Sequence, residues 1–107
     1  MSGEEEPLLQ KLENLLETMK DWERKPIIKV GKAVVELVKL PRRETKKSIE
    51  PERLVLHIRL EDSFKGVFIP GSLELGDIVT ALSNKTVEQI AKALDEINRR
   101  RIVEFKL

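Results

Sequence analysis

The chain has 107 residues, of which 40% are hydrophobic and 36% are charged. This length suits one domain, residues 1–107, and the hydrophobic share argues against a disordered chain. The lack of cysteine excludes a disulfide scaffold, a thiol nucleophile and a cysteine-based zinc site, and a single histidine excludes motifs that need two. A net charge of +1 argues against a polycation held to DNA by bulk charge.

The composition also bears on habitat and compartment. Few glutamines, asparagines and methionines beside many lysines, glutamates and arginines are typical of a hyperthermophile. Charge is sorted along the chain, since residues 1–24 carry a net −4 and residues 25–107 a net +5. No apolar run is long enough to cross a membrane, and the acidic start is unlike a signal peptide. We therefore expect a cytoplasmic protein that does not bind membranes.

The first helix is predicted over residues 7–22. Pro7 suits a first turn because its missing N–H costs nothing there, and Pro26 is expected to end the helix. Within this segment Leu8, Leu12, Leu15 and Met19 follow both helical and heptad spacing. The stripe predicts either packing against the chain's own domain or the interface of a homo-oligomer.

Residues 27–30 and 33–40 are rich in valine and isoleucine and predict two strands. Gly31–Lys32 between them fits a two-residue hairpin turn with glycine in the first central position. Residues 41–53 form a charged stretch that contains Pro41 and Pro51 and has no apolar period. This basic loop is predicted to be either a loop or an extended hairpin tip.

Residues 54–61 alternate most clearly, with Leu54, Leu56, Ile58 and Leu60 on one face and Val55, His57, Arg59 and Glu61 on the other. One face is expected to be buried and the other at least partly exposed to water. Residues 64–69 predict a further strand, in which Gly66 indicates a bulge or a close approach of another backbone.

Two helices follow, over residues 72–83 and from Thr86, where Thr86 and Gln89 form a capping-box pattern and Asn84 is a suitable left-handed stop for the preceding helix. Residues 102–107 alternate weakly and predict a last strand. The chain is therefore expected to be an α+β domain, with an antiparallel meander sheet of four to five strands covered by an N-terminal helix and two C-terminal helices.

Few residues of the sequence fit the patterns of enzyme active sites. The glycines do not form a phosphate-binding or dinucleotide-binding loop. Glu61 and Asp62 form a carboxylate pair that fits a solvated turn better than an acid–base or metal site. The chain has no second histidine and no cysteine to act with His57, so we expect His57 to be a surface or interface residue. The sequence predicts a protein that is not an enzyme and that uses no metal or other cofactor.

A basic constellation stands out instead. Residues 41–53 carry five bases against three glutamates, and further basic side chains continue onto the neighbouring strands. Such a surface can bind phosphates, while apolar and aromatic side chains between the lysines and arginines can hold unstacked nucleobases. The candidate nucleic-acid-binding residues are Trp22, Arg42, Arg43, Lys46, Lys47, Arg53, His57, Arg59, Lys65 and Phe68.

The order of elements resembles that of the archaeal ThermoDBP-type single-stranded DNA-binding proteins: a first helix, Trp22 and Pro26, a basic hairpin, the alternating strand and two closing helices. The resemblance implies an apolar cleft for bases beside an antiparallel sheet, flanked by basic side chains, and oligomerisation through helices. It assigns Arg42, Arg43, Lys46, Lys47 and Arg59 to the basic flank, and Trp22 and Phe68 to the cleft.

We therefore expect a homo-oligomeric binder of nucleic acid, with single-stranded DNA favoured over RNA or duplex. The alternative is an assembly module in which residues 8–22 contact a protein partner. A further alternative is that the basic loop is only a solvated loop, in a protein rich in ion pairs, and binds no ligand.

Overall fold

The structure, a computed structural model, describes residues 5–101. Contacts divide the chain into two compact units, Met1–Gly71 with a helix and all described strands, and Ser72–Leu107 with two helices. The predicted α+β class is confirmed by a four-stranded antiparallel sheet, one N-terminal helix and two C-terminal helices. The single domain expected over residues 1–107 stays a prediction.

The main sheet is the predicted meander. Its strands lie in the order β1, β2, β5 and β6, and each neighbouring pair is antiparallel. These strands are β1 (Arg24–Val30), β2 (Ala33–Leu40), β5 (Arg53–Leu60) and β6 (Gly66–Ile69). The predicted strand at residues 102–107 lies outside the described residues.

The turn between β1 and β2 is the predicted two-residue hairpin, with Gly31 at a φ of 58°. Pro26 does not end the first helix but lies inside β1, where the register shifts between Pro26 and Ile28. A proline is tolerated there because β1 is an edge strand and a bulge relieves the missing hydrogen bond.

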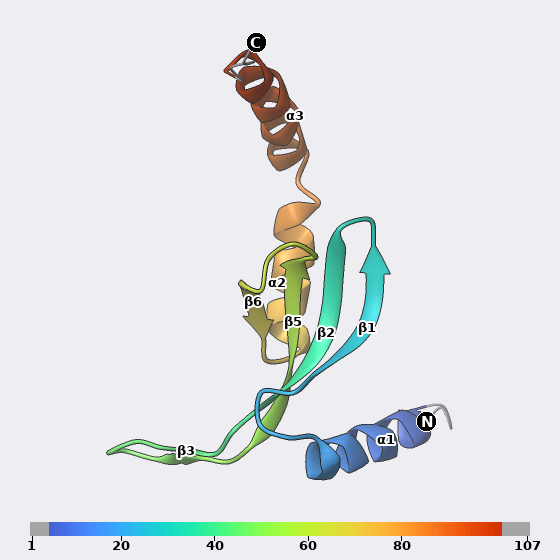
Figure 1. Cartoon of the computed structure of the whole chain (residues 1–107), viewed down its shortest axis with the longest axis vertical. Coiled ribbons are helices and arrows are strands. Elements are labelled where there is room, and N and C mark those ends of the chain that lie inside the picture. The colour runs from blue at the N-terminus through green and yellow to red at the C-terminus, as the bar shows by residue number, and fades with distance from the viewer. Residues whose placement is uncertain (1–4, 102–107) are drawn as a thin grey trace, which may run out of the picture. The chain divides into compact units, whose positions relative to one another are not determined.

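Residues 41–53 form an extended hairpin tip. The short strands β3 (Arg43–Glu44) and β4 (Ile49–Glu50) pair with each other and continue the register of the Leu40–Arg53 pair. Pro41 and Pro51 interrupt the ladder because neither has an N–H to donate. We call residues 42–52 the ribbon; Figure 1 shows it projecting beyond the sheet, at the same end as the first helix.

The first helix, α1 (Glu5–Thr18), ends earlier than the predicted residue 22. Trp22 has a φ of 66°, which a right-handed helix cannot contain, and its N–H donates to the Lys39 carbonyl at 2.7 Å. The Lys39 ammonium group is buried and donates to the Met19 carbonyl at 2.9 Å, just past the helix end. Pairing with the end of β2 thus stops the helix.

The heptad stripe of α1 faces the chain's own sheet over part of its length. Met19 is buried, and Leu12 and Leu15 line a groove with Leu37 and Leu56 from the adjacent sheet face. Leu8, at the start of the stripe, lines the same groove but remains 58% exposed. Packing within the chain therefore buries Met19, whereas Leu8, Leu12 and Leu15 border a groove that stays open.

The opposite face of the sheet contains a buried charged residue, Glu36. The alternation predicted for β5 is observed, since His57 pairs with Glu36 across the sheet and lies on the same face. His57 is only 1% exposed, however, whereas Leu60 from the apolar set is 56% exposed. The expectation of a surface histidine is wrong, because a hydrogen bond to Glu36 and the ring of Phe68 cover it.

The second unit consists of α2 (Ser72–Leu82) and α3 (Lys85–Arg100), and neither helix has a buried residue. Asn84, expected as a left-handed stop, is instead the N-cap of α3, with a φ of −68° and its side chain accepting from the Thr86 N–H at 2.8 Å. Asparagine is among the best N-cap residues, so it displaces the predicted Thr86 box. Within residues 5–101, no helix has the length and apolar character needed to cross a membrane.

Candidate nucleic-acid interface

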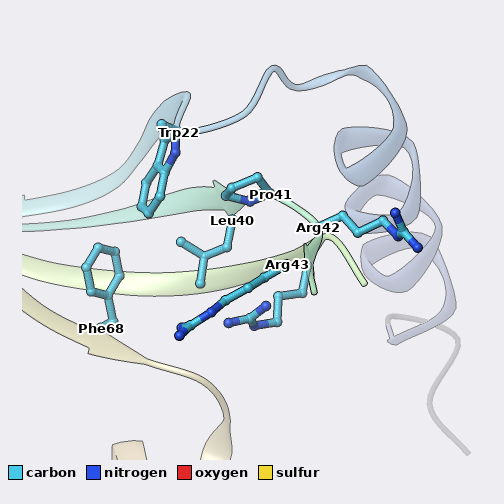
Figure 2. Close-up of a pocket in the computed structure, with 7 residues that line it drawn as sticks. Trp22, Leu40, Pro41, Arg42, Arg43 and Phe68 are labelled. Carbon is cyan, nitrogen blue, oxygen red and sulfur yellow. The ribbon is translucent and has the colours of Figure 1, made fainter. Parts of the chain in front are cut away.

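A pocket of about 380 Å³ opens where the ribbon leaves the sheet. Its lining comes from the connection before β1, the end of β2, the root of the ribbon, the start of β5 and the edge strand β6 (Figure 2). These elements meet because β2 and β5 pair side by side and β6 pairs with β5. The lining residues are Trp22, Leu40, Pro41, Arg42, Arg43, Arg53 and Phe68.

Two aromatic side chains form walls of this pocket and are open to solvent. Trp22 is 59% exposed and Phe68 is 45% exposed. Figure 2 shows both rings on the same side of the sheet, with Leu40 between them and the ribbon. Exposed rings beside an apolar floor offer flat surfaces on which other planar groups can stack.

The backbone of Trp22 is strained. A φ of 66° is unfavourable for a bulky side chain and costs on the order of 1–3 kcal/mol. The hydrogen bond from its N–H to Lys39, together with that from the Lys39 N–H to the Glu23 carbonyl at 3.2 Å, holds this conformation. A strained backbone that carries an exposed ring makes Trp22 a candidate functional residue.

Three arginines line the pocket, and they differ in their partners. Arg42 pairs with Glu44 at 2.8 Å, and its side chain extends away from the two rings in Figure 2. Arg53 pairs with Glu50 at 3.5 Å, and Arg43 has no carboxylate partner among residues 5–101. Both pairs are solvent-exposed and therefore contribute little stability, so a phosphate can compete for these guanidinium groups.

The remaining predicted basic residues lie elsewhere. Lys46 and Lys47 occupy the exposed tip of the ribbon, and Lys65 is exposed just before β6. None of these three forms an ion pair within the described part of the chain. The structure thus places two lysines on the ribbon that starts at the pocket, and one outside the pocket.

His57 and Arg59 belong to a buried cluster around Glu36. A single Glu36 oxygen, Oε2, accepts hydrogen bonds from the Arg24 Nη1 at 2.9 Å, from the His57 Nδ1 at 2.9 Å and from the Arg59 Nε at 3.1 Å. Arg59 also donates to three carbonyls at the end of β5 and in the turn that follows, including that of Ser63 at 3.3 Å. These contacts remove both side chains from the expected nucleic-acid surface.

Opposing effects act on the Glu36 carboxyl. Burial alone would raise its pKa, because desolvation penalises the charged form. Two influences oppose burial: hydrogen bonds from His57 and Arg59, and the positive charges of Arg59 and Arg24. Together they outweigh the effect of burial and lower the pKa of Glu36 below its ordinary value. Glu36 is therefore ionised at neutral pH and ties three strands together.

The cluster also supports the pocket wall. The His57 ring lies against the Phe68 ring, with centroids 4.6 Å apart. His57 is held in turn by Glu36. His57 and Arg59 thus act beneath the pocket rather than inside it.

Five of the ten predicted nucleic-acid-binding residues meet in one pocket: Trp22, Arg42, Arg43, Arg53 and Phe68. The prediction missed the floor residues Leu40 and Pro41 and the supporting residue Glu36. A signal for Glu36 was present, since it is a lone carboxylate in the otherwise apolar first six residues of β2, and a buried charge needs partners from neighbouring strands.

No group of three or more potential metal ligands occurs among residues 5–101. Comparison of the chain with protein-family models, with curated protein sequences and with solved structures gives no match.

Proposed function

We propose that this protein is a non-enzymatic nucleic-acid-binding protein that prefers single-stranded DNA. The observation that carries the proposal is the convergence of Trp22, Phe68 and three arginines on one pocket. The ThermoDBP-type resemblance adds the preference for DNA over RNA. A cytoplasmic location is part of the same proposal, because the protein would encounter single-stranded DNA there.

The two rings supply the contact with the bases. Stacking of a base on an aromatic side chain contributes roughly 1–3 kcal/mol and tolerates any base. The faces of a base are accessible to Trp22 or Phe68 only when the base has left the helical stack. This requirement favours single strands over duplex.

The arginines supply the contact with the phosphates. Arg43 and Arg53 lie beside the apolar floor of the pocket, so a strand whose base sits on the rings carries its phosphates toward them. Guanidinium groups bind phosphate oxygens with two parallel hydrogen bonds, and each neutralised phosphate releases counterions. Binding is therefore expected to weaken as salt rises.

Fluorescence anisotropy of a labelled single-stranded oligonucleotide tests the proposal. The double variant Arg43→Ala/Arg53→Ala should bind at least tenfold more weakly than wild type and show a shallower salt dependence. The matched control Lys32→Ala/Lys85→Ala removes the same charge from two exposed residues that do not line the pocket and should bind within about twofold of wild type. No binding by wild type at low salt would refute the proposal.

A second candidate function, self-assembly through α1, rests on the groove between α1 and the sheet. This groove has a volume of about 630 Å³, and Leu8, which lines it, is 58% exposed. A second copy of the chain that fills the groove would form a homo-oligomer. Light scattering should then show more than one chain per particle in wild type and a monomer in Leu8→Glu, whereas a monomeric wild type would eliminate this candidate.

A further inference from the structure

The ribbon is a closed, two-stranded arm. At its tip the Thr45 N–H donates to the Ser48 carbonyl at 2.8 Å, and the Ser48 N–H donates to the Thr45 Oγ1 at 3.0 Å. These bonds form a tight turn whose two central residues are Lys46 and Lys47. At about 3.4 Å per residue, the five residues from Arg42 to the tip span about 17 Å.

Charge is sorted along the ribbon. Its three glutamates are all engaged by bases at or near the root, because Glu44 pairs with Arg42, Glu50 with Arg53 and Glu52 with Lys39 at 3.2 Å. The tip lysines have no carboxylate partner within residues 5–101. The far end of the arm is therefore a concentrated cationic group, separate from the pocket at the root.

A stacking pocket for unpaired bases does not require such an arm. A two-stranded ribbon does fit the major groove of B-form DNA, which is about 12 Å wide. Each strand of B-form DNA carries one phosphate per about 3.4 Å of helix axis, so an arm of about 17 Å spans about five base pairs. The narrow, deep major groove of A-form RNA does not admit side chains in this way.

Resting on the proposed function, we propose that the preferred ligand is a DNA junction, in which a duplex continues into a single-stranded tail. The pocket at the ribbon root takes the unpaired bases next to the junction. The ribbon lies along the major groove of the adjoining duplex, where Lys46 and Lys47 contact phosphates. The pocket and the arm act on one ligand because Arg42, Arg43 and Arg53 belong to both the pocket lining and the region where the arm joins the sheet.

Anisotropy titrations with three labelled ligands of shared sequence test this inference: a single strand, a blunt duplex and a duplex with a single-stranded tail. Wild type should bind the tailed duplex about tenfold more tightly than the single strand. Lys46→Ala/Lys47→Ala should weaken binding of the tailed duplex about tenfold more than binding of the single strand, and so remove that gain, and should reduce the salt slope for the tailed duplex by about 2. A tailed RNA duplex should show no gain.

The matched control is Lys32→Ala/Lys85→Ala, which should keep the junction preference, and circular dichroism should show every variant folded. Equal wild-type affinity for the single strand and the tailed duplex would overturn the junction inference and leave the proposed function standing. An equal loss of affinity for the single strand and the tailed duplex in Lys46→Ala/Lys47→Ala would also overturn the junction inference and leave the proposed function standing. Failure of wild type to bind any of the three ligands would overturn both.

Discussion

The ring of Phe68 lies against the ring of His57, with centroids 4.6 Å apart and the planes inclined by 42°. Phe68 is 45% exposed and lines the pocket, while His57 is 1% exposed and hydrogen-bonds to Glu36. A solvent-facing wall of the pocket therefore rests directly on the buried ion cluster. The cluster is expected to govern the stability of the sheet and, through Phe68, the shape of the pocket.

Glu36→Gln tests the cluster. The variant keeps the shape of the side chain but leaves Arg24, His57 and Arg59 without their shared carboxylate. Removing one partner from a buried ionic network costs about 3–5 kcal/mol, so we expect the free energy of unfolding in urea at pH 7 to fall by about 3 kcal/mol. Glu44→Gln, which breaks the exposed pair with Arg42, should cost less than about 1 kcal/mol. Equal losses in the two variants would contradict this assignment.

The same carboxyl predicts a dependence of stability on pH. Because the pKa of Glu36 is lower in the folded protein than in the unfolded chain, its contribution is fully present above the ordinary glutamate pKa and is lost as the pH falls through the folded value. Urea midpoints of wild type should therefore decrease as the pH is lowered from about 5. The Glu36→Gln variant should show a shallower decrease over this range, and parallel curves would argue against the predicted role.

Trp22→Asn separates stability from binding. Asparagine tolerates a positive φ far better than tryptophan does, so the substitution relieves strain of about 1 kcal/mol while losing the contacts of a half-exposed ring. We expect a melting temperature no lower than that of wild type, together with at least a tenfold loss of affinity for single-stranded DNA. A folded variant with undiminished affinity would exclude Trp22 from the interface.

Gly66 and Gly76 form a matched pair for alanine substitution. A Cβ at Gly66 would overlap the carbonyl oxygen of Ile58 in the neighbouring strand, so Gly66→Ala must displace β6 and the Phe68 wall with it. Gly76 lies in α2 with nothing within 4 Å of the added atom, and alanine there should stabilise the helix by about 0.5–1 kcal/mol. Thermal melts should shift in opposite directions, and unchanged stability of Gly66→Ala would contradict the close packing of β5 and β6.

Local sequence patterns predict much of this fold because they report local structure. The predicted bounds 33–40 coincide with β2, the Gly31–Lys32 turn is correct, and the close approach expected at Gly66 is confirmed. Alternation along β5 also predicts which residues share a face. It does not predict which face is buried, because the burial of His57 depends on its pairing with Glu36 in another strand.

The candidate site was partly predictable for the same reason. The basic character of residues 41–53 is visible in the sequence, as is the scarcity of aromatic residues, of which Trp22 and Phe68 are two out of four. Their convergence depends on strand order, because Phe68 reaches the pocket only through the pairing of β6 with β5. Whether a given lysine or arginine is neutralised by a carboxylate also depends on tertiary contacts, as the ion pair between Arg59 and Glu36 shows.

Stacking of bases in the pocket is tested most directly by the fluorescence of Trp22, the only tryptophan in the chain, during titration with an unlabelled single-stranded DNA oligonucleotide at two salt concentrations. We predict quenching that saturates at low salt and weakens at high salt, because a base stacks on the indole while phosphates bind the arginines. Anisotropy of a labelled strand recorded in parallel reports binding independently of Trp22. Binding by anisotropy with no change in Trp22 emission would show that bases do not stack on Trp22.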